Sequence, residues 1–531
     1  MRRTNWKTRA LLAPMVALLL TAGAYAAAPG ITGTTFNLTA VQFYLNQPDG
    51  AAVYSWGYGC STGFAPTFAP AAITTANCPA LMGQVPGPTL IVTEGQTVTV
   101  TLTNNLPAAA GNTSILFPGF KVTPTGGVAG LLTQEAAHNG SVTYTFTASS
   151  PGTRAYYSGT QADLQVEMGL YGAIIVLPNN VSSACTGGLA AANLLVEAAH
   201  GEADFRLAKA GYDHAKSCYD REYLFQFAEM DPNIHHQAEA EVIARATCTA
   251  GNAGCSLDVP TEPYHPAYFL INGRSMPDDM DGNYGAEYPH QPYNGNPHMH
   301  PGEQVLIRVI GQGRWQHPFH EHANHVRILA RDGNLILSTT NPAANLAGPL
   351  QFTTTTTPGL AFDGIFYFTG RGLNWDMYGH NHADAPGSNA APFCYPDTNG
   401  YYTANSTPPA PPSAINYYEW CQDHFKPVQV APFGDVEGGG PATLPDANIF
   451  TNGAWYSGSP YLGPDATTRA TGPTSSFLPA NTQANPADER GFAFMWHSHN
   501  EREITTNNVF PGGMLMMMLV DSREFVIDES K

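Results

Sequence analysis

The chain has 531 residues, a formal net charge of −19 and only 12% charged side chains. Nucleic acid and anionic membrane surfaces are poor partners for so acidic a protein, because binding either one requires a basic face. The length predicts more than one domain. The composition, with 53 glycines, 43 prolines and 11% aromatic residues, favours strands and long loops over helices.

Residues 1–28 have the pattern of a secretory signal peptide. Four basic side chains between Arg2 and Arg9 precede an apolar run from Leu11 to Leu20, and small residues follow near Ala26. The run is too short for a membrane span, and no later stretch is long and apolar enough to be one. We therefore predict an exported protein of the periplasm, the cell surface or the extracellular space.

All eight cysteines follow this leader, and an even number of cysteines in an exported chain predicts disulfides. Many connectivities are open, and we predict pairing between neighbours in the sequence. The expected pairs are Cys60–Cys78, Cys185–Cys218, Cys248–Cys255 and Cys394–Cys421.

Residues 29–180 are expected to form the first domain. The stretches Pro86–Leu106 and Ser141–Ala148 alternate β-branched and polar residues, and turn signals separate them. Short strands of this kind predict a β-sandwich or barrel of about 150 residues. A connector at 181–218 follows, with some helical character at 201–215.

Residues 219–531 are expected to form a second domain of the same kind. Between about 374 and 490 the chain is dense in proline, glycine, asparagine and tyrosine and has little periodicity, which predicts a long loop insertion. Strands are predicted within 220–230, 268–277, 301–313, 326–333, 358–372 and 514–520.

Two short histidine-rich segments are the main candidates for function. In WQHPFHEHANH (315–325), His320 and His322 would share one face of a strand, and His317 would lie on the other. In FMWHSHNERE (494–503), His497 and His499 would likewise lie opposite Ser498. If the two strands are neighbours, four imidazoles converge. This pattern predicts a metal site for copper, zinc, iron or nickel, with His317 behind it.

The remaining motifs are weaker. We interpret the pairs His298 with His300 and His380 with His382, and also His325, as solvent-exposed loop residues. The methionines of residues 514–520 are better explained by core packing than by a copper(I) site. A cupin would need a glutamate soon after His322, and none is there. Motifs of hydrolases and nucleotide-binding proteins are absent.

The order of these pieces resembles the multicopper oxidases, which are built from cupredoxin domains. PGPTLIVTEGQTVTVTLTN and GLYGAIIVLP are similar to the first cupredoxin domain, HPFHEH to the HPxHxH motif and WHSH to the terminal HCH segment. The resemblance implies an all-β protein of tandem cupredoxin-like Greek-key β-sandwich domains. It also implies a type 1 copper ligand at His317, a type 2 ligand at His320, and type 3 ligands at His322, His497 and His499.

The chain departs from that family at several ligand positions. Ser498 stands where the family has the cysteine that makes the blue copper site, and Glu503 stands where its next type 1 histidine falls, although Met514 matches the axial position. In the first domain, four ligands of the trinuclear cluster are replaced, and the four-electron laccase route is therefore not expected. The replacing residues are Leu116, Pro118, Tyr157 and Gly159.

We therefore expect a protein that binds copper, or else zinc, through a remnant cluster of His320, His322, His497 and His499, assisted by His317. One hypothesis is a copper-dependent oxidoreductase of non-laccase type whose small-molecule substrate binds at the metal. The alternative is a non-catalytic copper-binding, storage or structural cell-surface protein. A homotrimer is compatible with the resemblance, because metal sites can lie between subunits in this superfamily.

Overall fold

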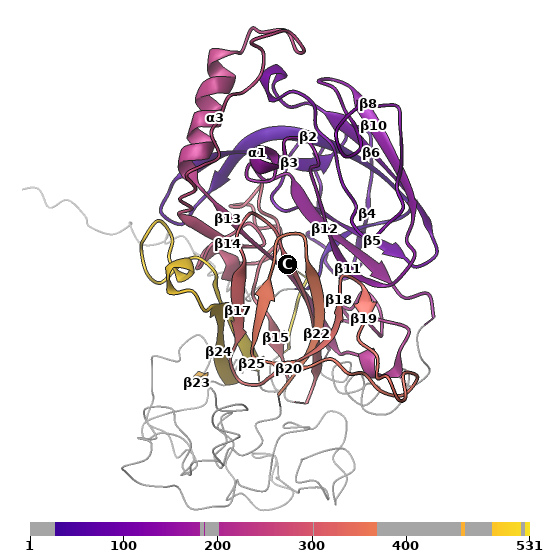
Figure 1. The fold of residues 1–531 in the computed structure, drawn as a ribbon. Coiled ribbons are helices and arrows are strands. Elements are labelled where there is room, and N and C mark those ends of the chain that lie inside the picture. Colours follow the sequence, from indigo (N-terminus) through magenta and orange to yellow (C-terminus); the bar gives the residue numbers. More distant parts are fainter. Residues whose placement is uncertain are drawn as a thin grey trace, which may run out of the picture.

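The computed structural model describes residues 27–180, 185, 201–300, 302–368, 458–461, 491–521 and 526–530 (Figure 1). Nearly all of the predicted leader, most of the predicted insertion and the Cys394–Cys421 pair lie outside this part of the chain. Within it, no helix is long and apolar enough to cross a membrane.

The first half of the described chain, residues 27–180, folds as two five-stranded sheets. At the turn between β5 (Gly87–Thr93) and β6 (Thr97–Asn104), Gly95 has a φ of 84°, a backbone conformation that favours glycine. One sheet has the order β11 (Gly152–Tyr157), β12 (Tyr171–Leu177), β5 (Gly87–Thr93), β1 (Gly30–Thr32), β4 (Thr67–Ala69). The other has the order β3 (Ala52–Cys60), β2 (Thr35–Asn46), β6 (Thr97–Asn104), β10 (Ser141–Thr147), β7 (Thr123–Thr125).

Short elements complete this half. They are β8 (Val128–Ala129) paired with β9 (Gln134–Glu135), the 3-10 helix η1 (Ala108–Ala110) and the one-turn helix α1 (Ala162–Gln165).

The second half also contains two large sheets, of seven and six strands. The first has the order β14 (Tyr268–Ile271), β13 (Arg221–Met230), β16 (Gln304–Gly311), β22 (Ala361–Tyr367), β18 (Val326–Arg331), β19 (Asn334–Leu335), with β20 (Leu350–Gln351) beside β18. The second has the order β15 (His298–Met299), β25 (Leu515–Asp521), β24 (Gly491–Ser498), β17 (His317–Glu321), β21 (Thr353–Thr356), with β23 (Gly458–Tyr461) beside β24.

These sheets confirm the predicted all-β architecture, and among the strands of the described residues no sheet mixes the two halves. Each half has its own core. Phe225, Phe319 and Trp496 pack together in the second core, and Met514 and Met516 lie there too, as expected for packing methionines. The short 3-10 helices η3 (Ala215–Ser217), η4 (Asp278–Met280) and η6 (Glu501–Ile504) connect the strands.

Two features of the connecting segments differ from the sequence prediction. The helical character expected at 201–215 is wrong, because the segment is irregular up to η3. The helix α3 (Pro232–Ala244) was not predicted. Its N-terminus is defined by proline in the first turn and by Asp231, whose side chain accepts the N–H of Asn233. α3 packs Ile234 and Ala238 into the core of the first half, although it belongs to the second half in sequence (Figure 1).

Three of the predicted disulfides are confirmed. Cys60 pairs with Cys78, Cys185 with Cys218 and Cys248 with Cys255.

The expectation of exposed histidines at 298 and 300 is wrong, since both side chains are buried. Carboxylates make their burial tolerable. His298 Nδ1 lies 2.5 Å from Asp521 Oδ2, and His300 Nε2 lies 2.6 Å from Glu202 Oε1. His325 is half-buried, with its ring 5.1 Å from that of Phe352, while His380 and His382 lie outside the described residues.

Buried polar contacts join the two halves. Thr153 of β11 donates its hydroxyl to Asp363 of β22 at 2.6 Å, and Arg308 of β16 donates to the same hydroxyl oxygen at 3.1 Å. Glu222 of β13 holds the Arg308 guanidinium at 2.9 Å. Because all four side chains are buried, these contacts fix the relative positions of β11, β16 and β22.

Candidate metal centre

The pairing of β17 with β24 creates the histidine cluster. These strands are antiparallel, and His320 lies directly opposite His497. Their neighbours Phe319 and Ser498 form the next pair and face the other way. Beyond the strand ends, the N–H of His499 donates to the carbonyl of Pro318 at 2.7 Å, which continues the alignment. The alternation expected from the sequence therefore places the imidazoles on one face.

Three of the four predicted imidazoles form a compact, buried group. One nitrogen from each of His320, His322 and His497 lies within 4.8 Å of the others. The Nε2 atoms of His322 and His497 are 3.2 Å apart, and their ring planes are nearly perpendicular, at 79°. Such convergence of three imidazole nitrogens is typical of a metal site.

Two of the three rings make a close polar contact through Nδ1. His497 Nδ1 lies 2.6 Å from the carbonyl oxygen of Ser498, which can only accept, so this nitrogen carries the proton. His320 Nδ1 lies 2.6 Å from Thr353 Oγ1 of β21. Contacts of this kind orient metal-binding histidines and fix their tautomers.

The environment favours the neutral form of His320 and His497, as metal binding requires. Burial, followed by repulsion from His322, His497 and His499, lowers the pKa of His320 to about 3. Burial also lowers the pKa of His497. Protons therefore compete little with a metal for His320 near neutral pH.

His499 lies at the open side of the cluster. Half of its side chain is exposed (50%), whereas His320, His322 and His497 are buried. Its ring centroid lies 4.8 Å from that of His320 and 5.6 Å from that of His497. A metal held by the three buried histidines would therefore be approached from the His499 side.

The structure does not bring His317 to the cluster. Its Nδ1 lies 2.8 Å from Glu503 Oε2, and its Nε2 lies 2.9 Å from Glu229 Oε2. Ser498 donates its hydroxyl to the same oxygen of Glu503 at 2.5 Å. The three positions that the family resemblance assigns to a type 1 copper, at 317, 498 and 503, thus meet in an internal ion-pair network.

Glu229 of β13 was not recognised in the sequence, and it anchors this network. Its Oε1 accepts the N–H groups of Arg314 and Trp315, each at 2.7 Å, and the Tyr264 hydroxyl at 3.2 Å. Gly313 has a φ of 67°, and a Cβ there would lie 2.5 Å from Glu229 Oε2. The turn before β17 therefore closes around the carboxylate, and only a residue without a side chain fits.

The two segments of the first half in which the family resemblance would place ligands do lie together. Leu116 and Tyr157 exchange backbone hydrogen bonds of 2.7 and 3.3 Å. A Cβ on Gly159 would lie 2.7 Å from Cγ of Leu116, so the leucine side chain occupies the space that a larger residue at 159 would need. These positions contain no imidazole, thiol or carboxylate.

Thr353 was also missed, because nothing in the run TTTTT (353–357) distinguishes one threonine from the next. Only the pairing of β21 with β17 places Thr353 opposite His320. Glu503 was found by its spacing from the histidines, although its contact with His317 was not.

The His317 network predicts a specific pH dependence of stability. Burial alone would lower the pKa of His317, but its hydrogen bonds to Glu229 and Glu503 outweigh burial and raise the pKa to about 9. A raised pKa stabilises the fold fully below the unfolded value of about 6.5, and this contribution is lost as the pH rises through about 9.

We expect the free energy of unfolding of the wild type, relative to His317→Gln, to fall by up to about 3 kcal/mol between pH 6.5 and 9.5. Chemical denaturation of the metal-free proteins across this range measures the difference. Because other titrating groups are common to both proteins, parallel pH profiles would contradict the ion pairing of His317.

Comparison with known proteins finds a family model that matches part of the chain. A family model described as multicopper oxidase matches residues 66–181. No curated protein matches the sequence. Solved structures that are similar include the multicopper oxidase mgLAC (16% identity, TM-score 0.42, covering 92% of this chain and 86% of that one). A blue copper oxidase from Nitrosomonas europaea is also similar (14% identity, TM-score 0.42, coverage 92% and 85%). The comparisons therefore show a likeness to multicopper oxidases in the sequence of residues 66–181.

Proposed function

We propose that this chain is an exported, multicopper-oxidase-like protein that binds one copper ion through His320, His322 and His497, with His499 at the open side. The observation that carries this proposal is the convergence of three buried imidazole nitrogens within 4.8 Å. Export through the predicted leader is part of the proposal. The three disulfides support it, because disulfides persist in oxidising compartments.

The donor set fits copper and also accommodates zinc, because imidazole suits both ions. The match of residues 66–181 to a multicopper oxidase model favours copper. His320, His322 and His497 would hold the ion, while Thr353 and the Ser498 carbonyl orient two of the rings. Bound copper would supply one-electron redox chemistry at the open side, where His499 is positioned to contact a small molecule.

A laccase-type reaction does not fit the residues. The type 1 position lacks a thiolate. His317 contacts both Glu503 and Glu229, and Glu503 also accepts the Ser498 hydroxyl. The first half offers Leu116 and Gly159 where the family has ligands. A reducing substrate would therefore have to bind at the histidine cluster itself, so the enzymatic form of the proposal is a copper-dependent oxidoreductase of non-laccase type.

A non-catalytic role as a copper-binding, storage or structural cell-surface protein is the second candidate. It is favoured by the residues at the type 1 position. Ser498 and an ion-pair network stand there instead of a thiolate that could relay electrons. A homotrimer is compatible with either candidate.

The metal site predicts the behaviour of a double variant, His320→Ala with His497→Ala. We expect the copper-reconstituted wild type to contain about one copper per chain, with a type 2 electron paramagnetic resonance signal and no intense blue band. The double variant should lose this copper, because two of three buried ligands are gone.

The matched control is His325→Ala, which removes a nearby histidine outside the cluster and should retain the metal. Equal copper content in the wild type and the double variant would overturn the site.

Thr353→Val tests how the cluster is oriented. Valine has nearly the same shape but cannot form a hydrogen bond with His320 Nδ1. Loss of such a hydrogen-bond partner weakens metal binding about 10- to 100-fold. Competition titrations with a chelator measure the affinity. Thr355→Val, two residues along the same strand, is the control and should bind as the wild type does. Unchanged affinity in Thr353→Val would show that the hydroxyl does not orient the ligand.

Substrate-dependent oxygen consumption separates the two candidates. If the chain is an oxidoreductase, the copper-loaded protein should consume oxygen with at least one phenolic, amine or metal-ion reductant, and the double variant should not. Absence of turnover by a protein that holds stoichiometric copper would favour the non-catalytic role.

A further inference from the structure

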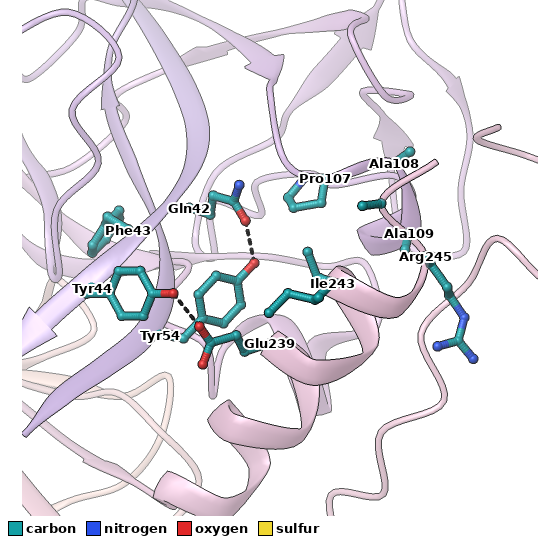
Figure 2. A pocket seen from close by; sticks show the side chains of 12 residues that line it. Gln42, Phe43, Tyr44, Tyr54, Pro107, Ala108, Ala109, Glu239, Ile243 and Arg245 are labelled. Atoms are coloured by element: carbon teal, nitrogen blue, oxygen red, sulfur yellow. Dashed lines mark hydrogen bonds between the residues drawn. The ribbon is translucent and has the colours of Figure 1, made fainter. Parts of the chain in front are cut away.

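A second candidate binding site lies far along the chain from the histidine cluster. It is a groove of about 660 Å³ between α3 and the hairpin of β2 and β3 (Figure 2). Its size is typical of sites for small molecules. The lining residues are Gln42, Phe43, Tyr44, Tyr54, Pro107, Ala108, Ala109, Glu239, Val242, Ile243, Arg245 and Ala246.

The walls of this groove are apolar and partly exposed. Ile243 of α3 is 67% exposed and Tyr44 of β2 is 48% exposed, which is unusual for large apolar side chains that share one hollow. Pro107 and Ala108, at the start of η1, form the opposite side, toward which Ile243 extends in Figure 2. The groove can therefore take up the apolar body of a ligand.

One end of the groove carries aromatic rings and a carboxylate. Tyr44 and Tyr54 meet edge to face, with ring centroids 5.7 Å apart. The Tyr44 hydroxyl donates to Oε1 of Glu239, and the Tyr54 hydroxyl donates to Gln42 at 2.5 Å (Figure 2). Among the described residues, Oε2 of Glu239 has no hydrogen-bond or ion-pair partner.

The charge inside the groove is negative. Arg245 is the cation of the lining, but its guanidinium is paired with Glu241 at 3.0 Å and points away from the tyrosines in Figure 2. The Glu239 carboxylate is therefore left as the charge beside the rings. Aromatic faces and a carboxylate together favour a cation, and the net charge of −19 attracts cations from a distance.

We propose that this groove binds an organic monocation, an amine with a compact apolar body. The ammonium group pairs with Glu239 and lies against Tyr44 and Tyr54, while Pro107 and Ile243 contact the apolar part. The groove shares no residue with the histidine cluster, so ligand binding there can be tested independently of metal binding.

Three probes that share one body test the charge class: phenethylamine, 2-phenylethanol and phenylacetate. Isothermal titration calorimetry on the metal-free protein should give saturable binding of phenethylamine, about tenfold or more tighter than the alcohol, and no binding of phenylacetate. Equal affinity for amine and alcohol, or no saturable binding of the amine, would overturn the proposal.

Variants locate the site. Glu239→Gln keeps the size of the side chain and should weaken phenethylamine about tenfold while leaving 2-phenylethanol unchanged. Ile243→Ser should weaken both, because it removes apolar wall. Glu287→Gln makes the same change of charge at an exposed carboxylate outside the groove and should bind as the wild type does. Thermal unfolding verifies that each variant is folded, and an unchanged amine affinity in folded Glu239→Gln would refute the site.

Discussion

The candidate metal centre depends on one backbone interaction, the antiparallel pairing of β17 with β24. This pairing places His320 opposite His497, across a sequence separation in which the long predicted insertion lies. Because side chains alternate along a strand, a shift of one residue would turn the imidazoles into the core and the core residues outward. Phe319 and Trp496, both fully buried, make such a shift costly. The hydrophobic core therefore sets the register of the clustered histidines.

On the opposite face of the same strands, the register brings together an ion-pair network instead of a cluster of imidazoles. There His317, Ser498 and Glu503 meet, and Glu229 from β13 completes the group. Burying charges without partners would be strongly destabilising, so the network is tolerated only because each carboxylate receives several donors. These residues thus form a structural network of ion pairs and hydrogen bonds. Removal of one partner would leave the others buried and uncompensated.

The two halves of the molecule share more than a covalent connection. Thr153, Arg308 and Asp363 link them through buried polar contacts, and α3 packs its apolar side on the first core. The groove lined by Tyr44 and Glu239 depends on this arrangement, since α3 forms one of its walls. The histidine cluster, by contrast, is built entirely within the second half.

The sequence by itself determined the β architecture and the shared face of the histidines, because alternation along a strand is a local property. Three disulfides agree with the predicted pairing of neighbours, which was one of many open connectivities. The sequence failed where distant partners decide the outcome. His298 and His300 are buried because Asp521 and Glu202 reach them, and the apolar residues of α3 form only a weak apolar face that would reveal the helix before it packs. Thr353 and Glu229 resemble many other residues of their types. Only the tertiary structure decided their roles. The pairing of β21 with β17 places Thr353 against His320, and the turn that closes around Glu229 lets this carboxylate form an ion pair with His317.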